Sequence, residues 1–312
     1  MGKFVSLSEA KAKLNRKVSI PYQILIKNAL QEDLGKNDIT TQALFTKKSP
    51  RVSARIIAKQ DLVLAGAMIA KKTFKQVDPQ LKIRLIKKDG IFCEAGQSIL
   101  EISGKASSIL TAERTALNFL QHLSGVATLT QRFVQAVKGT CAKILDTRKT
   151  LPGWRNLQKY AVKVGGGANH RFGLYDAYLI KDNHLALYGS LSQAIEAVRK
   201  HRGKKSIKIE VEVDTLQQFE EAIDCGPDII LLDNMSLEDM HLAVLRNHKI
   251  PPKNRPKLEA SGSVNLNNVR AIAQTGVDFI SVGALTHSAQ AMDLSLEIKL
   301  DREMVFAIKK FS

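Results

Sequence analysis

The chain has no apolar run long enough to cross a membrane. A spanning helix needs about 20 predominantly apolar residues, and no such run occurs among the 312 residues. The first 19 residues, MGKFVSLSEAKAKLNRKVS, are too polar for a secretory signal. We therefore expect a soluble, cytoplasmic protein with no membrane partner.

Cysteine and aromatic residues are also scarce. The three cysteines, Cys93, Cys141 and Cys225, lie far apart in the sequence, which offers no metal-ligand spacing, and their odd number argues against a disulfide framework. We expect reduced, buried thiols. Aromatic residues make up only 5% of the chain, and neither zinc-finger spacing nor the aromatic signature of an RNA-recognition module occurs.

Positive charge is in excess. The chain has 47 Lys and Arg against 30 Asp and Glu, a formal net charge of +17, and such a balance can indicate a nucleic-acid-binding protein. The cations are spread along the chain and no nucleic-acid motif accompanies them. A basic surface with anionic substrates is the better interpretation, and we predict no nucleic-acid partner. The alternative predicts salt-sensitive binding to nucleic acid.

From residue 140 onward, short apolar runs alternate with amphipathic stretches. This alternation is typical of βα units and a parallel sheet. The predicted strands are 143–145, 177–180, 207–213, 228–232, 257–260 and 278–282, and the predicted helices between them are 190–201, 215–224, 236–247 and 265–275. Six strands are too few to require a closed eight-stranded barrel.

The first hundred residues have a different pattern. We predict a helix over 21–34 and strands over 52–58, 82–87 and 98–103, which indicate a separate unit of helices and strands. A helix over 108–124, stopped by Gly125, joins the two parts. The predicted domains are an N-terminal domain over 1–117, completed by 290–312, and a catalytic domain over 118–289.

The predicted strands end in polar residues, and in parallel barrels the carboxyl ends of the strands form the active site. Between Ile144 and His184 this edge is rich in cations. The basic or imidazole side chains are Arg148, Lys149, His170, Arg171 and Lys181. Together they suit a substrate with several negative charges, such as a phosphate or a polycarboxylate.

Acidic residues are expected at the same edge. In the run from Ile207 to Val213 a strand would direct Glu210 and Glu212 into the barrel, while the apolar odd positions pack on helices. Buried carboxylates require partners. Lys181, Arg148 or a bound cation could provide them.

With these segments in place, the chain resembles the quinolinate phosphoribosyltransferase family over residues 20 to 298. The resemblance rests on an ordered set of motifs, which is far more specific than the glycine run alone. The motifs are Glu32-Asp33-Leu34-Gly35, Asp38-Ile39-Thr40-Thr41, Ala112 to Asn118, Asp146 to Gly153, Gly165 to Arg171, Glu210 to Val213, Leu232-Asp233-Asn234 and Glu259-Ala260-Ser261-Gly262.

The resemblance implies an α/β fold in two parts, an N-terminal α/β sandwich domain beside an open, incomplete α/β barrel of parallel strands. It also implies a homodimer, with higher assembly left open. In the family, the arginine that matches Arg114 reaches across the dimer interface toward quinolinate.

The implied reaction is that of a pentosyltransferase of NAD biosynthesis. Quinolinate and phosphoribosyl pyrophosphate combine, with Mg²⁺ as the cofactor, to give nicotinate mononucleotide, pyrophosphate and CO₂. The implied ligands of quinolinate are Arg114, Thr147, Arg148, His170, Arg171 and Lys181. Forked guanidinium groups suit its two carboxylates because they form paired hydrogen bonds.

The same resemblance implies a second pocket, for phosphoribosyl pyrophosphate. Its implied catalytic residues are Lys149, Glu212 and Asp233, with Mg²⁺ near the two acids and held partly through the substrate pyrophosphate. The phosphate-binding turns are Ser261-Gly262-Ser263 and Val282-Gly283-Ala284. Ser263 departs from the family pattern, which usually has a second glycine there.

Two other enzyme classes remain as alternatives. A related pyrophosphate-releasing enzyme, of the kind encoded beside molybdate transporters, would use a different acceptor. An aldolase-like barrel would instead use Lys181 as a Schiff-base nucleophile.

Overall fold

The computed structural model describes residues 22–45 and 49–299. The chain folds into two compact units. Of the described residues, the first comprises 22–45, 49–128, 152–165 and 289–299, and the second 129–151 and 166–288. These limits differ from the predicted boundary at 117/118, because segments 118–128 and 152–165 belong to the first unit. Trp154 stacks on Phe119 with 4.9 Å between ring centroids, which holds the second of these segments to the first.

The first unit is built on an antiparallel sheet of strand order β12-β1-β5-β3. Its strands are β1 (Arg51–Ala58), β3 (Lys82–Leu85), β5 (Ser98–Lys105) and β12 (Leu294–Lys299), and a small pair is formed by β2 (Leu62–Val63) and β4 (Phe92–Cys93). The helices are α2 (Tyr22–Leu34), α3 (Ile39–Leu44), α4 (Ala67–Val77), α5 (Ala106–Ala136) and α6 (Arg155–Val164).

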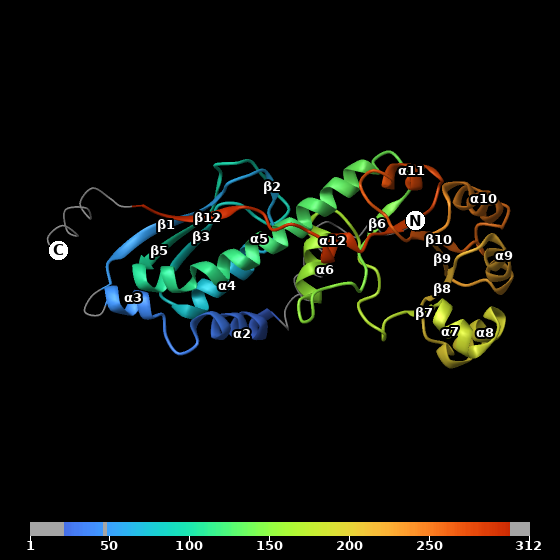
Figure 1. The fold of residues 1–312 in the computed structure, drawn as a ribbon, viewed down its shortest axis with the longest axis horizontal. Helices are drawn as coiled ribbons and strands as arrows, with labels where there is room; N and C mark the ends of the chain where they lie inside the picture. Colours follow the sequence, from blue (N-terminus) through green and yellow to red (C-terminus); the bar gives the residue numbers. More distant parts are fainter. Residues whose placement is uncertain (1–21, 46–48, 300–312) are drawn as a thin grey trace. The chain divides into compact units, whose positions relative to one another are not determined.

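Only one face of this sheet is apolar. Along β1 the burial alternates, with Val52, Ala54 and Ile56 buried, as a strand with one covered face requires. These side chains join Phe74 of α4 and Ile109 of α5 in one core cluster. Figure 1 shows α4 and α5 running beside the strands.

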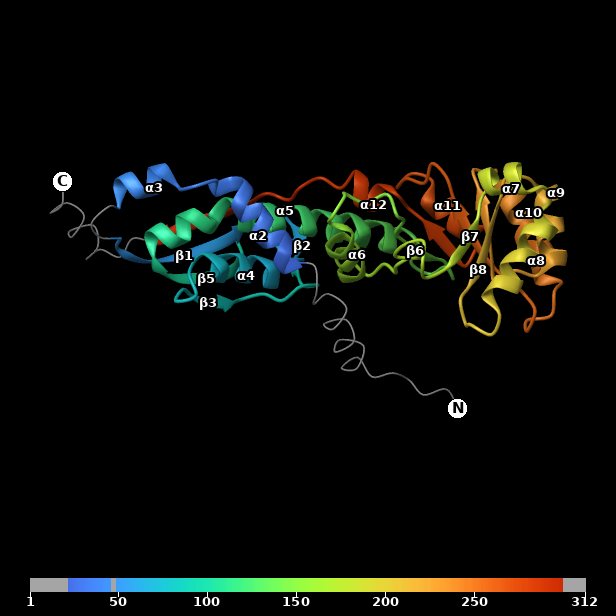
Figure 2. The same cartoon turned by 90° about the horizontal axis from the view of Figure 1, so that it is seen from below.

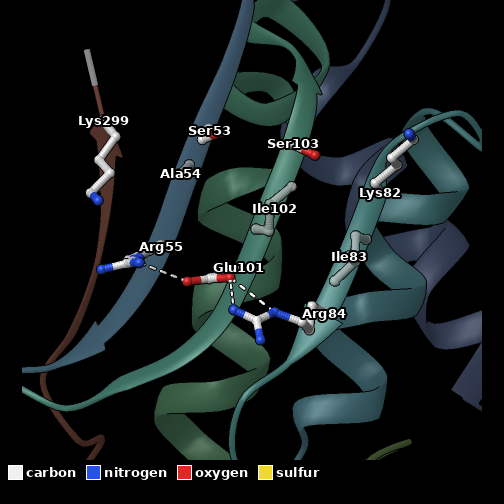
Figure 3. A pocket seen from close by; sticks show the side chains of 10 residues that line it. All are labelled: Ser53, Ala54, Arg55, Lys82, Ile83, Arg84, Glu101, Ile102, Ser103 and Lys299. Atoms are coloured by element: carbon white, nitrogen blue, oxygen red, sulfur yellow. Dashed lines mark hydrogen bonds and ion pairs between the residues drawn. The ribbon is translucent and has the colours of Figure 1, made fainter. Parts of the chain in front are cut away.

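The opposite face of the sheet carries a polar hollow of about 500 Å³. Figure 3 shows Glu101 at its centre, between Arg55 and Arg84. The Arg55 Nη2 atom lies 2.8 Å from the carboxylate and the Arg84 Nε atom 3.0 Å from it. Arg84 first, and Arg55 after it, hold the pKa of Glu101 below its usual value. Exposed pairs of this kind contribute little stability.

Helix α5 runs from Ala106 to Ala136, so the prediction that Gly125 stops it is wrong. A Cβ on Gly125 would lie 2.1 Å from the Gln290 carbonyl oxygen. Glycine is therefore needed inside this helix for the close approach of another backbone segment, rather than as a stop signal.

The second unit is a six-stranded sheet of order β6-β11-β10-β9-β8-β7, and each pair is parallel. Strands β6 and β7 are its two edges, so the barrel is open and incomplete, as predicted. The strands are β6 (Lys143–Leu145), β7 (Tyr178–Ile180), β8 (Ile209–Val213), β9 (Ile229–Asp233), β10 (Lys257–Ser261) and β11 (Phe279–Ser281).

Helices lie between these strands along the chain, and α12 follows the last of them (Figure 2). They are α7 (Asp182–Tyr188), α8 (Leu191–Arg202), α9 (Leu216–Cys225), α10 (Leu237–His248), α11 (Val269–Gln274) and α12 (Ala284–His287). Ser190, Thr215 and Ser236 cap α8, α9 and α10 by accepting a backbone N–H, which is why the predicted starts of these helices lie within one residue of the observed ones.

Over residues 22–45 and 49–299, no helix has both the length and the apolar character that crossing a membrane requires. All three cysteines are free, but only Cys93 is buried. Cys141 is exposed and Cys225 is partly exposed, so the expectation of three buried thiols is wrong for these two.

Asp89 holds three parts of the first unit together, and replacing it should destabilise the protein. Its carboxylate accepts the N–H groups of Gly66 and Ala67 at the start of α4, each at 2.9 Å, and the Tyr160 hydroxyl of α6 at 2.6 Å. Asp89→Ala removes this cap and leaves the hydroxyl unpaired. We expect a loss of roughly 2–4 kcal/mol in the free energy of unfolding.

Chemical denaturation followed by circular dichroism measures this loss. Lys88→Ala, at the exposed neighbouring position, is the control and should change stability by less than about 0.5 kcal/mol. Equal midpoints for the two variants would contradict the role assigned to Asp89.

Candidate active site

The polar residues predicted at the strand ends lie at the carboxyl edge of the sheet in the second unit, except Glu210, which lies near the start of β8. Parallel pairing brings these ends to one side. The residues are Asp146 after β6, Lys181 after β7, Glu210 and Glu212 in β8, Asp233 in β9, Ser261 in β10 and Gly283 after β11.

The glycine-rich loop lies along β6. Ala168 forms a parallel bridge with Leu145, and its N–H donates to the Ile144 carbonyl at 2.8 Å. Asp146, fully buried, accepts the His170 backbone N–H at 3.0 Å and the Asn169 side-chain amide. Asp146 therefore fixes the backbone that leads to Arg171.

The His170 ring lies between the loop and the floor of the sheet. Its Nδ1 atom accepts the Arg171 backbone N–H at 2.8 Å. Its Nε2 atom lies 3.0 Å from Glu210 Oε2 and 3.4 Å from Glu259 Oε1. A nitrogen that accepts a hydrogen bond carries no proton, so the neutral ring has its proton on Nε2. Both ring nitrogens thus bind protein groups, which favours a supporting role over the direct substrate contact predicted from the sequence.

Arg148 and Arg171 bring two guanidinium groups near each other. Burial first, and the charge of Arg148 next, lower the pKa of Arg171, while Glu210 and Asp176 oppose that shift. Arg171 Nη1 also donates to the Ala177 carbonyl at 3.2 Å. Two neighbouring cations repel each other, and a dianion with two carboxylates would relieve that repulsion.

Lys181 forms an ion pair with Glu212, which confirms that a neighbouring cation balances an acid of β8. The Glu212 side chain is only 11% exposed, whereas that of Lys181 is 43% exposed. His184 Nδ1 accepts the Lys181 backbone N–H at 2.9 Å, so this histidine supports the lysine. The pair joins one residue from each predicted pocket.

The turns after β9 and β10 are interlocked. Asn234 has a left-handed backbone with φ of 52°, its N–H donates to the Ser261 carbonyl at 2.9 Å, and its side-chain amide donates to Asp233 Oδ2 at 2.9 Å. Gly262 has φ of 96° and Ser263 of 48°. Ser263 thus adopts the conformation that favours the glycine usual at this position.

Lys149 lies against the turn after β11. The methylene carbon Cδ of its side chain would be 3.1 Å from a Cβ added to Gly283, and its carbonyl accepts the Thr286 hydroxyl at 2.7 Å. The Thr147 hydroxyl accepts the Lys149 N–H at 3.0 Å. This arrangement places Lys149 beside Val282-Gly283-Ala284, the predicted phosphate turn.

Arg114 belongs to the first unit, where it is exposed on α5. Its expected role concerns a second copy of the chain and is taken up below.

Two residues of this edge had no assigned role in the sequence prediction. Asn234 was named only as part of a motif, although its position directly after Asp233 could have indicated that it belongs to the site. Glu259 is fully buried, and burial first, with the charge of Glu210 next, raises its pKa to about 8. The sequence feature that could have identified Glu259 is an acidic side chain among apolar neighbours in a predicted parallel strand.

Comparison with known proteins identifies the family. Residues 38–124 match the N-terminal domain and residues 126–297 the C-terminal domain of quinolinate phosphoribosyl transferase. A probable nicotinate-nucleotide pyrophosphorylase [carboxylating] of Bacillus subtilis is 43% identical over 282 residues, which cover 90% of this chain and 94% of the relative. The Mycobacterium leprae enzyme of the same type is 44% identical over 276 residues, 88% of this chain and 95% of the relative.

Solved structures agree. The nicotinate-nucleotide pyrophosphorylase of Francisella tularensis superposes with a TM-score of 0.84 at 41% identity, covering 91% of this chain and 99% of that one. A parallel open sheet with cations and carboxylates at its carboxyl edge is thus the scaffold of a phosphoribosyltransferase. The chain belongs to the quinolinate phosphoribosyltransferase family.

Gly262 should not tolerate a side chain. A Cβ there would lie 2.1 Å from Asn234 Oδ1, so Gly262→Ala must displace the amide that holds Asp233, in addition to the cost of a left-handed alanine, about 1 kcal/mol. We expect a markedly lower melting temperature and loss of most activity.

Gly139→Ala separates these two effects. Gly139 has φ of +84° and nothing within 4 Å of the added Cβ, so this variant carries backbone strain without the clash. If both variants lose the same stability and activity, the contact with Asn234 is unimportant.

Proposed function

We propose that the open edge of the sheet transfers a phosphoribosyl group to quinolinate, with release of pyrophosphate and CO₂, to form nicotinate mononucleotide for NAD biosynthesis. The observation that supports this most directly is the match to both family domains, from residue 38 to residue 297. The second unit also has a cationic side, which suits the dicarboxylate, and an acidic side, which suits the ribose.

Arg148, Arg171 and Lys181 form the quinolinate side. Guanidinium groups bind carboxylates through two parallel hydrogen bonds, and Arg148 is close enough for its charge to lower the pKa of Arg171. Thr147 and His170 shape this side, because the threonine hydroxyl holds Lys149 and the imidazole holds Arg171.

Glu212, Asp233 and Lys149 form the phosphoribosyl pyrophosphate side. As pyrophosphate departs, the ribose carbon gains positive charge, and fixed carboxylates nearby stabilise that charge. Lys149 meets phosphate oxygens from its place beside Gly283. The backbone N–H groups of Ser261-Gly262-Ser263 and Val282-Gly283-Ala284 suit the 5′-phosphate.

The Lys181–Glu212 pair links the two sides. A quinolinate carboxylate would compete with Glu212 for the Lys181 ammonium, and the developing positive charge on the ribose would compete with Lys181 for the Glu212 carboxylate. Binding of both substrates therefore replaces one internal ion pair with two contacts to ligand.

Mg²⁺ is the cofactor that this chemistry favours. Glu212 and Asp233 offer hard carboxylate oxygens, the ligand type that Mg²⁺ prefers, and substrate phosphates usually complete its coordination. Near these residues, a bound Mg²⁺ would neutralise the charge that develops on the leaving pyrophosphate.

The substrate and the two sides can be tested together. Purified protein with quinolinate, phosphoribosyl pyrophosphate and Mg²⁺ should yield nicotinate mononucleotide and CO₂. Arg148→Ala and Arg171→Ala should each raise the KM for quinolinate by about 10- to 100-fold, because each removes a charge-assisted contact. Glu212→Ala should mainly lower kcat.

Lys253→Ala, at an exposed position of the same unit, is the control and should match the unaltered enzyme. Turnover with another base but none with quinolinate would contradict the substrate assignment. Equal changes in KM for the arginine and Glu212 variants would contradict the division into two sides.

A homodimer that shares its active sites completes the proposal, with Arg114 of each subunit reaching quinolinate bound by its partner. Arg114 supports this because it is exposed on α5 with Asn118 one turn further along. Assembly beyond the dimer and a cytoplasmic location stay predictions.

Subunit complementation tests the shared site. Arg114→Ala and Arg148→Ala enzymes, each assayed at a quinolinate concentration far below its raised KM, where it has little activity alone, should regain activity when unfolded and refolded together. Random pairing gives one intact site in about half of the dimers, hence roughly a quarter of normal activity. No recovery in a mixture shown to contain heterodimers would exclude a contribution of Arg114 across the interface.

A further inference from the structure

A cluster of buried acids lies beneath the proposed quinolinate side. Asp146, which directly follows β6, is 0% exposed, and Glu210 of β8 and Glu259 of β10 are 2% and 0% exposed. Among the described residues, Glu210 Oε1 and Glu259 Oε2 are buried without a hydrogen-bond partner. Burial of a charged or unpaired polar group is costly, so the protonation of this cluster needs an explanation.

The two glutamates share one neighbour that can donate a proton. Ligand atoms of His170, Glu210 and Glu259 lie within 4.8 Å of one another. Because His170 Nδ1 accepts the Arg171 N–H, the neutral ring has only its Nε2 proton to donate toward the two carboxyl groups. The Ser281 hydroxyl donates to Glu259 Oε1. Two ionised carboxylates this close and this deeply buried repel strongly, and one of them is expected to be neutral.

Geometry indicates which one is neutral. Glu210 is the nearer to the His170 Nε2 atom, at 3.0 Å against 3.4 Å for Glu259. Its charge also acts on the Arg171 guanidinium. Among the described residues, the Glu259 carboxyl group has the longer imidazole contact and the hydrogen bond from the Ser281 hydroxyl. Burial and the charges of Glu210 and Asp146 raise its pKa, while His170 and Ser281 only partly oppose them.

We propose that Glu259 is a positioning residue that is held as the neutral acid, so that Glu210 remains the single carboxylate that orients the His170 ring and, through Nδ1, the backbone of Arg171. Its effect on quinolinate rests on the proposed function. One consequence is that Glu259 adds no negative charge beneath the cationic side. That side is therefore more positive than the number of acids suggests, which favours a dianionic ligand.

A metal ion held by His170, Glu210 and Glu259 is the competing explanation. A ring that binds a metal through Nε2 normally donates a proton from Nδ1, but here Nδ1 faces the Arg171 N–H donor. The hydrogen bonds of the ring therefore favour a proton over a metal.

Stability as a function of pH tests the proton without any substrate. The pKa of Glu259 is raised in the folded state to about 8, from an ordinary value of 4.5. The unaltered protein therefore has its full stabilisation below pH 4.5 and loses it as the pH rises toward 8. Glu259→Gln mimics the neutral acid and cannot ionise, so its Tm relative to the unaltered protein should increase from pH 5 to 8 and then level off.

Glu196→Gln, exposed on α8, is the matched control, and its Tm difference should stay constant over this range. A constant difference for Glu259→Gln as well would show that Glu259 is already ionised, and would overturn the proposal.

Kinetics test the positioning role. In the unaltered enzyme the KM for quinolinate should rise above pH 8, and this rise should disappear in Glu259→Gln. At pH 7, Glu210→Gln should raise KM about tenfold because it removes the carboxylate that holds His170, whereas Glu259→Gln should raise it less than threefold. A Glu259→Gln enzyme with the larger effect, or with the unaltered pH profile, would contradict the assignment.

Calorimetric titration of the unaltered protein with Zn²⁺ and with Mn²⁺, without substrates, decides between proton and metal. Tight binding that is lost in Glu259→Gln would overturn the proposal, and equal weak binding by both proteins supports it. Because the stability and metal measurements use no quinolinate, an enzyme that fails to turn over quinolinate would refute the proposed function and leave the result on Glu259 intact.

Discussion

The hydrogen bond between His170 and Glu210 joins two parts of the site, and the other polar groups of the site depend on it. It ties the glycine-rich loop beside β6 to the floor formed by β8. Asp146 holds the backbone at His170 from one side, and the ring holds the Arg171 N–H from the other. Asp146 and, through the His170 ring, Glu210 therefore fix the backbone from which the Arg171 side chain extends.

Charge balance sets a second constraint. Parallel strands deliver their polar ends to one edge, and this brings Arg148 and Arg171 into mutual repulsion while Glu210 and Glu259 lie below them. The exposed layer is cationic and the buried layer is acidic. The ion pair of Lys181 with Glu212 joins one residue of the proposed quinolinate side to one of the proposed ribose side, so on this proposal the arrival of one substrate would change the charge that the other encounters.

Much of this arrangement follows from the sequence, because it depends on local patterns. All six parallel strands were predicted within two residues at each end, and Ser190, Thr215 and Ser236 marked the helix starts through their caps. The course of α5 through Gly125 was not predictable, since it depends on the approach of Gln290 from a distant segment. The orientation of His170 was not predictable either, because it depends on side chains from β8 and β10 that only the folded sheet brings together.

A hollow in the surface does not by itself mark a ligand site. The hollow on the sheet of the first unit, about 500 Å³, is lined by Arg55, Glu101 and Arg84, whose charges pair with one another at the surface. In the second unit, by contrast, two buried carboxyl oxygens have no hydrogen-bond partner in the part of the chain that the structure describes, and the neighbouring guanidinium groups of Arg148 and Arg171 repel each other. Groups left in an unfavourable state by folding are the ones that a ligand can stabilise. The cost of burying Glu210 is thus explained by the His170 ring it orients and, through that ring, by the backbone of Arg171, whereas the paired charges of the first unit have no comparable need for a ligand.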